Sequence, residues 1–148
     1  MTGVEFHTGV ADKLGFACRL VRKAWRSGKR VVVTGAPEPL DQLDALLWIF
    51  EQGEFVPHAR LRAGQAIAPL LARTPIWLAD APVDALAGGA PAEVLINLGP
   101  DLAADAGRFE RLIEIVADAA DDIASGRQRW RSHVAAGLTP TNHKQAGS

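Results

Sequence analysis

The sequence contains a single cysteine, Cys18, among its 148 residues, so no disulfide bond can form within the chain. Chains without disulfide bonds are typical of a reducing compartment. Cys18 lies at the helical core spacing of its segment, and we expect it to be a packing residue and not a catalytic nucleophile. The cysteine content therefore favours a cytoplasmic protein.

Long apolar runs are also missing. No stretch of 18 consecutive apolar residues occurs, so the sequence predicts no transmembrane helix. The first ten residues, MTGVEFHTGV, lack the basic start and the apolar core of a secretory signal peptide. Both absences lead us to expect a cytoplasmic protein with no membrane partner.

The motifs of cofactor chemistry are absent as well. Neither G-x-G-x-x-G after a strand nor G-x-x-x-x-G-K-[ST] occurs. The turn 35–37 has too few glycines to hold a phosphate, and its proline removes an amide donor. The four histidines show no metal-ligand spacing, and no serine has the context of a nucleophile elbow. The sequence therefore predicts no cofactor, no metal and no catalytic residues.

The net charge is small, but its distribution is uneven. At −1 for the whole chain, the charge provides no overall basic field to attract nucleic acid. Residues 101–122 contain seven acids and two arginines, whereas residues 123–148 contain four cations and no acid. A basic end beside an acidic segment indicates local recognition of an anion, and the alternative is an ordinary solvated surface.

What the sequence does contain is a core. It is 48% hydrophobic and 22% charged, which is typical of a single globular domain. Apolar residues recur at helical spacing between Asp12, a plausible N-cap, and Gly28, which suits the position after a helix. Residues 31–33 are consecutive valines, typical of a strand covered on both faces of a parallel sheet. A helix followed by a buried strand is half of a βαβ unit.

The same reasoning predicts the remaining elements. We expect further strands at 4–7, 76–79, 94–98 and 111–116, and further helices at 40–50 and 118–136. Pro57 makes residues 54–58 an edge strand or an extended loop. The predicted fold is α/β, a single compact three-layer domain over residues 1–138 with a mostly parallel sheet, followed by a flexible tail at 139–148.

Two places suggest a binding surface. Trp48 falls on the polar side of helix 40–50, where a tryptophan is either covered by another segment or offered to a partner. Arg127 lies three residues before Trp130, and Gly126 beside it indicates the close approach of another group. An arginine next to an aromatic ring suits a chain end that carries a carboxylate and an apolar side chain. Alternatively, Arg127 pairs with the acids that precede it.

Five segments together resemble the chi subunit family of bacterial DNA polymerase III. They are AWRSGKRV at 24–31, LDALLW at 43–48, FVPH at 55–58, VLINL at 94–98 and GRQRWR at 126–131. Their order and spacing match over roughly residues 4–138. The combination is specific, although no single segment would be.

The resemblance implies a Rossmann-like fold without a nucleotide and a non-catalytic role. A chi subunit joins the clamp loader, through the psi subunit, to the single-stranded-DNA-binding protein, so its contact with single-stranded DNA is indirect. The acidic, phenylalanine-terminated tail of that protein is expected at Arg127, with Trp130, Val116, Trp48 and Gly137 around it. The psi subunit is expected at Phe55, Val56 and Pro57. The family often has tyrosine where Trp130 stands, and nothing carries over to residues 59–93.

Two other functions stay open at this point. One is a small nucleotide-handling α/β enzyme, which would need a cleft at the carboxyl ends of its strands. The other is direct binding of single-stranded nucleic acid by the basic end of the chain, through Arg127, Arg129, Arg131 and Lys144. The nearly neutral net charge argues against the second function.

Overall fold

Parallel strands form the centre of the molecule. In the computed structural model, which describes residues 2–49, 56–62, 74–80, 93–103, 107 and 109–145, they lie in the order β3-β4-β2-β5-β6-β1-β7. The strands are β1 (Gly3–Val10), β2 (Val31–Thr34), β3 (Ala59–Leu61), β4 (Ile76–Ala79), β5 (Val94–Asn97), β6 (Arg111–Ala117) and β7 (Thr141–Lys144). Each pair of neighbours is parallel, so the sheet is entirely parallel where we expected it to be mostly so.

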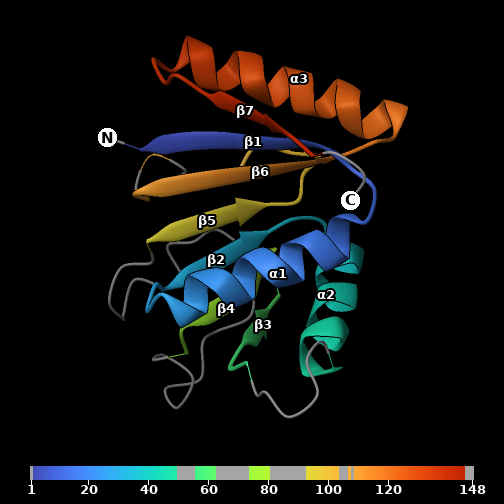
Figure 1. Cartoon of the computed structure of the whole chain (residues 1–148), viewed down its shortest axis with the longest axis vertical. Coiled ribbons are helices and arrows are strands. Elements are labelled where there is room, and N and C mark those ends of the chain that lie inside the picture. The colour runs from blue at the N-terminus through green and yellow to red at the C-terminus, as the bar shows by residue number, and fades with distance from the viewer. Residues whose placement is uncertain are drawn as a thin grey trace.

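In the described part of the chain, three helices cover the two faces of the sheet. They are α1 (Lys13–Arg26), α2 (Pro37–Ile49) and α3 (Ala120–Ala135). The helices α1 and α2 pack on one face, against alternate residues of the central strands, whereas α3 packs on the opposite face, above β6 and β1. Figure 1 shows α1 and α2 beside the β2–β4–β3 half and α3 at the β1–β7 end. The predicted three-layer α/β class is confirmed.

Local sequence explains the best predicted elements. Asp12 caps α1, its side chain accepting a hydrogen bond from the backbone N–H of Gly15 at 3.1 Å. Gly28 has a φ of +79°, the left-handed conformation expected just after a helix. The three valines of β2 are fully buried, because helices or other segments of the chain cover both faces of the strand.

Strand β7 gives a regular structure to residues 141–144, which lie within the predicted flexible tail at 139–148. Residues 141–144 pair in parallel with β1, with Glu5 opposite Thr141 and Thr8 opposite Lys144. All four residues of β7 are exposed, so the strand is held by backbone hydrogen bonds to the sheet edge and not by apolar burial. A strand of this kind leaves no hydrophobic pattern in the sequence.

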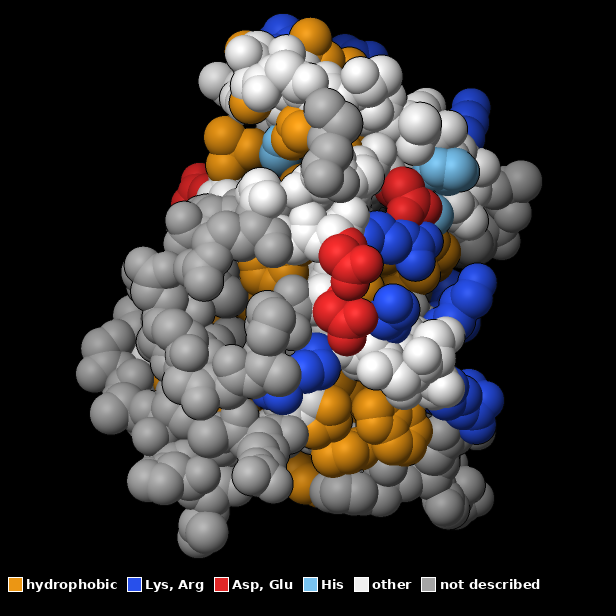
Figure 2. Space-filling view, turned by 90° about the vertical axis from the view of Figure 1, so that its left-hand side faces the viewer, with side chains coloured by type: hydrophobic (Ala, Val, Ile, Leu, Met, Phe, Trp, Pro, Cys, Tyr) orange, Lys and Arg blue, Asp and Glu red, His pale blue; other side chains and the backbone are white. Residues whose placement is uncertain are grey.

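The end of the sheet at which the strands begin carries paired charges. Arg111 of β6 forms an ion pair with Glu5 of β1, and Lys29 pairs with Glu93 at 3.2 Å. Acidic and basic side chains lie next to one another on this side of the molecule (Figure 2). Exposed pairs such as Lys29–Glu93 contribute little to stability, and this end of the sheet has no single sign of charge.

Gly126 lets α3 approach the sheet closely. A Cβ atom at this position would lie 2.8 Å from Cγ2 of Val116, a distance that real Cβ atoms do not tolerate. The expectation that Gly126 marks a close approach is confirmed, and the approaching group is Val116 of β6.

Replacing Gly126 by alanine should therefore destabilise the fold. Gly126→Ala forces α3 away from β6, and overpacking of this kind costs about 1–3 kcal/mol, only part of which the better helix propensity of alanine offsets. Urea unfolding of Gly126→Ala would measure the loss. In a Val116→Ala background the same substitution should lose most of its cost, and an equal cost in both backgrounds would show that Val116 is not the obstacle.

Candidate functional site

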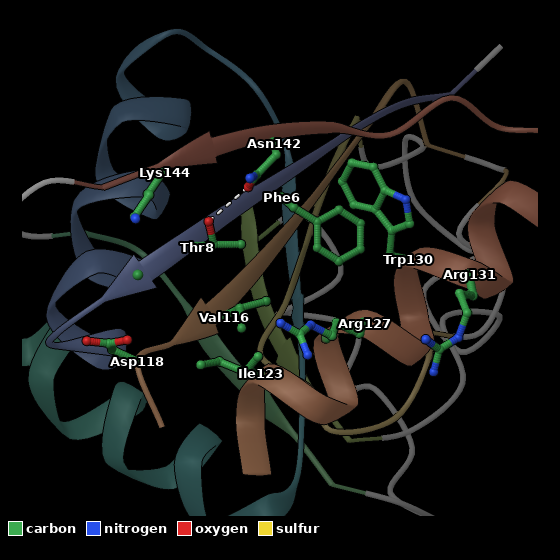
Figure 3. A pocket seen from close by; sticks show the side chains of 12 residues that line it. Phe6, Thr8, Val116, Asp118, Ile123, Arg127, Trp130, Arg131, Asn142 and Lys144 are labelled. Carbon is green, nitrogen blue, oxygen red and sulfur yellow. Dashed lines mark hydrogen bonds between the residues drawn. The ribbon is translucent and has the colours of Figure 1, made fainter. Parts of the chain in front are cut away.

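A hollow of about 560 Å³ lies between α3 and the β6–β1–β7 end of the sheet. The residues that line it come from four elements and the turn after β6, and they are drawn in Figure 3. They are Phe6, Thr8, Gly9, Val116, Asp118, Ile123, Gly126, Arg127, Trp130, Arg131, Asn142 and Lys144. We call this hollow the α3 pocket.

The floor of the α3 pocket is apolar. Strand alternation points Phe6 and Val116 to the α3 side of the sheet, where they are 2% and 3% exposed. The ring centroids of Phe6 and Trp130 are 5.0 Å apart at an angle of 56°, a tilted contact that is favourable for aromatic rings. Ile123 completes this apolar group, which offers burial to an apolar side chain.

The rim of the pocket is mostly positive. Arg127 and Arg131 from α3 and Lys144 from β7 are exposed. Within the part of the chain that the structure describes, these three side chains make no hydrogen bond or ion pair, and Asp118 is the one acid among the lining residues. In Figure 3 the Arg127 side chain extends across the pocket toward Val116. An anion entering the pocket therefore meets cations that need not break another contact.

A buried carboxylate anchors α3 beneath this pocket. Glu114 of β6 has no solvent exposure. Its Oε1 accepts hydrogen bonds from Nε of Arg129 at 2.9 Å and from Nδ2 of Asn97 at 3.0 Å, and Oε2 lies 2.9 Å from Nε2 of His133. Arg129 and His133 are one turn apart on α3, so the carboxylate fixes how that helix is rotated on the sheet.

Arg129 is consequently part of the interior. It is 2% exposed, and its Nη1 donates at 3.0 Å both to the carbonyl of Pro100 and to Oγ of Ser125. Its Nη2 is buried without a hydrogen-bond partner. The expectation that Arg129 could serve a basic nucleic-acid surface is therefore wrong, because a side chain this buried cannot reach a phosphate.

Strand β7, which forms one wall of the pocket, is held from both of its faces. On the pocket side, Oγ1 of Thr8 donates to Oδ1 of Asn142 at 2.8 Å. On the other side, the His7 and His143 rings stack with centroids 5.0 Å apart, and Nδ1 of His7 lies 3.1 Å from Nε2 of Gln145. The geometry of the pocket wall therefore depends on a histidine stack behind it.

The structure brings together only part of the predicted tail site. Arg127, Trp130 and Val116 line the α3 pocket, but Trp48 and Gly137 are not among its lining residues. Trp48 belongs to α2, on the opposite face of the sheet, and its ring lies 4.8 Å from that of His58. Gly137 follows the end of α3 with a φ of +87°. Helical periodicity predicts which side of a helix is buried, but it does not predict on which face of the sheet the helix packs.

The predicted psi-binding segment is also divided. Val56 is 2% exposed and belongs to the core under α1 and α2, so it is not a surface residue. Pro57 is half-buried, and Phe55 lies outside the described residues. Near this segment α2 exposes two large apolar side chains, with Trp48 56% and Ile49 75% exposed.

Sequence reasoning missed several residues of the site. Glu114 could have been noticed, because a lone acid within the apolar run 112–116 must find partners when it is buried. Phe6 alternates with Val4 in the first predicted strand, which identifies it as core but not as pocket floor. Asn142 and Lys144 gave no signal, because β7 itself gave none.

An α/β domain that carries an apolar hollow with a positive rim has the features of a binding module. A profile of the family described as "DNA polymerase III chi subunit, HolC" matches residues 1–141. The DNA polymerase III subunit chi of Pseudomonas aeruginosa PAO1 is 30% identical over 149 residues, covering 97% of both chains. The chain belongs to the DNA polymerase III chi subunit family, whose members are accessory and not catalytic subunits in DNA replication.

A comparison of structures supports the fold alone. The C-terminal domain of the DEAD-box protein Dbp5 superposes with a TM-score of 0.60 at 12% identity, over 97% of this chain and 90% of the other. In the described residues no helix combines the length and the apolar character needed to cross a bilayer. The family expected from the five sequence segments is confirmed.

Replacing Glu114 alone should destabilise the fold strongly, and replacing Arg129 together with it should add less than the full cost of the Arg129 substitution alone. Glu114→Gln leaves the Arg129 guanidinium buried without its counter-charge, a change that typically costs about 3–5 kcal/mol. Denaturant unfolding of the single variants and of the double variant Glu114→Gln/Arg129→Met would measure the coupling. We expect the double variant to lose less than the sum of the single losses. Additive losses would mean that the two charges do not stabilise one another.

The stability of the β7 wall should depend on pH through His7. Burial lowers the pKa of the His7 imidazole from 6.5, although the neighbouring Glu5 favours the charged form. The unfolded chain therefore binds this proton more readily, and stability should decrease as the pH falls below about 6.5. Urea titrations between about pH 7 and pH 5 should show a shallower decrease for His7→Gln. Equal slopes for the two proteins would contradict this role.

Proposed function

We propose that this chi-family subunit, in the cytoplasm, connects the clamp loader, through the psi subunit, to the acidic C-terminal tail of the single-stranded-DNA-binding protein. The observation that carries the proposal is the α3 pocket, where Arg127 stands beside an apolar floor that includes Trp130 and Val116. The subunit works by binding, needs no cofactor, and reaches single-stranded DNA indirectly by this route.

The chemistry of the pocket suits a chain end. A guanidinium binds a carboxylate through two parallel hydrogen bonds, and Arg127 is available to do so at the edge of the hollow. An aromatic or aliphatic terminal side chain would pack on Phe6 and Trp130, which are already in contact. Acidic residues upstream of that end would be attracted by Arg131 and Lys144 on the rim.

The other interface belongs at the opposite end of the molecule. Strand order places β7 at one edge of the sheet and β3 at the other. We assign psi binding to the α2–β3 region, with Phe55 and Pro57 as the sequence suggests and with exposed Trp48 and Ile49 at the end of α2. Val56 is excluded by its burial. Two partners bound at opposite edges would not compete, which a bridging subunit requires.

Arg127→Ala should weaken the binding of an acidic tail peptide that ends in phenylalanine. Loss of a charge-assisted hydrogen bond in a partly dry site costs about 1.5–3 kcal/mol, or roughly 10- to 150-fold in Kd. Isothermal titration calorimetry with the full chain measures this, and the affinity of the unmodified chain should decrease with added salt.

Arg62→Ala is the matched control. Arg62 is also an exposed arginine, but it pairs with Asp41 on the far side of the sheet, so its replacement should leave the affinity for the peptide unchanged. Unchanged affinity in Arg127→Ala would remove Arg127 from the tail site. An equal loss in both variants would show only a general charge effect.

A further inference from the structure

The sheet ends at β7, which has a neighbouring strand on one side only in the part of the chain that the structure describes. In the strand order β7 is the last member, and it pairs with β1. All four residues of β7 are exposed. An edge strand presents a row of backbone N–H and C=O groups, and another chain can pair with them. The outer edge of β7 is therefore a surface whose ligand would be an extended chain.

The hydrogen bonds to β1 show which backbone groups of β7 face outward. The N–H of Gln145 donates to the carbonyl of Thr8 at 2.8 Å, so the backbone of Gln145 faces β1. Backbone groups of successive strand residues point to opposite edges of the strand, and His143, two residues earlier, therefore faces β1 as well. Asn142 and Lys144 point their N–H and C=O groups away from the sheet. Among the described residues these outward groups have no hydrogen-bond partner.

The same two residues of β7 line the α3 pocket. Asn142 and Lys144 place their side chains on the pocket side of the strand (Figure 3), whereas His143 stacks on His7 behind it. A peptide that pairs with the outer edge of β7 therefore lies next to the mouth of the pocket. In strand addition of this kind, main-chain hydrogen bonds supply affinity, and pockets beside the added strand select its side chains.

The packing of α3 defines the direction in which such a peptide would run. Trp130 packs on Phe6, whose partner on β6 is Glu114. Arg127 lies nearly one turn closer to the start of α3, where the helix approaches Val116. Val116 is two residues closer than Glu114 to the carboxyl end of β6. A chain with an apolar side chain on Trp130 and its terminal carboxylate at Arg127 therefore runs toward the carboxyl ends of the strands, parallel to β7.

Charge favours an acidic chain at this edge over a second copy of the protein. Lys144, Arg131 and Arg127 line the pocket beside the edge, and Asp118 is the one acid among the lining residues. A second copy paired edge to edge would bring its own Lys144 close to these cations, and like charges oppose such pairing. An acidic peptide instead brings charge of the opposite sign.

We infer that the acidic tail binds as an added strand, parallel to β7, before its terminal phenylalanine enters the α3 pocket. Its backbone pairs with the outward N–H and C=O groups of Asn142 and Lys144. The inference rests on the proposed function, because the tail is the occupant, and it deepens that function by assigning the path and the direction of the tail. A strand that buries no side chain then serves as the template for the next strand.

Amide hydrogen exchange, measured residue by residue by NMR on the isotope-labelled full chain, tests this inference. In the free protein the amides of His143 and Gln145 should exchange slowly because they donate to β1, whereas those of Asn142 and Lys144 should exchange rapidly. An acidic peptide that ends in phenylalanine, at about 100 times its Kd, should slow both outward amides by up to roughly 100-fold.

The exchange experiment also separates this inference from the proposed function. Unchanged exchange at Asn142 and Lys144, while binding still depends on Arg127, would overturn the added strand and leave the tail site in place. A peptide that does not bind at all would overturn both. Protection that needs no peptide and grows with protein concentration would show a second copy on the edge and would overturn the inference.

N-methylation of the peptide, one residue at a time, gives a second readout. A methyl group on an amide that faces β7 removes a hydrogen bond, whereas a methyl group on an amide that faces solvent does not. Upstream of the terminal phenylalanine, the affinity should therefore fall at every second residue, by roughly 5-fold each, and change little between them. Equal losses at successive residues would contradict strand pairing.

A matched pair of variants at Asn142 separates the backbone from the side chain. Asn142→Pro and Asn142→Ala both remove the side chain that accepts a hydrogen bond from Thr8, but only proline also removes the outward N–H. Proline is tolerated where an edge strand turns its N–H away from the sheet, and thermal unfolding checks that both variants fold. The proline variant should bind the peptide roughly 5-fold more weakly than the alanine variant. Equal affinity of the two folded variants would exclude this N–H from the interface and overturn the pairing.

Discussion

The buried Glu114 carboxylate is the interaction on which the binding face depends. A carboxylate without solvent is costly unless its oxygens are fully paired, and here Arg129 and His133 come from α3 while Asn97 comes from β5. The packing of Gly126 against Val116 determines how closely α3 approaches, and the carboxylate determines how it is rotated. Both are needed to place Arg127 and Trp130 over the sheet, and of the two groups only Val116 is also part of the pocket floor, since Glu114 is not among the lining residues.

The same network accounts for where the site is found. Proteins with open parallel sheets usually bind ligands outside the carboxyl ends of their strands. Here Asn97 ends β5, and its Oδ1 accepts hydrogen bonds from Oγ1 of Thr34 at the end of β2 and from the backbone of Gly99. Polar groups that could hold a nucleotide instead hold one another and Glu114. The α3 pocket lies instead near the carboxyl ends of β1, β6 and β7, between α3 and the β7 edge.

Sequence reasoning succeeded where burial leaves a pattern. The valines of β2, the cap at Asp12 and the glycine at 126 each have a local physical cause, and the structure confirms each one. It failed where the cause is distant. The family resemblance placed Trp48 in the tail site, but helical spacing cannot say on which face of the sheet a helix packs. It also placed Val56 at the psi interface, whereas Val56 is buried in the core beside β3, a strand that was not anticipated. Strand β7 has no buried side chain, so it is explained by the edge of β1 and by side-chain contacts such as Thr8–Asn142 and His7–His143, which no hydrophobic pattern announces.

The net charge is a sum over the whole chain, so it does not describe the charge at any one binding surface. A net charge of −1 excludes a uniform basic field, but a partner at the surface responds to charges within about 10 Å at 0.1 M salt. Acids elsewhere on the molecule therefore do not cancel the charge of Arg127, Arg131 and Lys144 for an anion bound in the α3 pocket. A nearly neutral chain can thus carry an anion-binding face, because the ligand responds to the charges that lie within a Debye length of it.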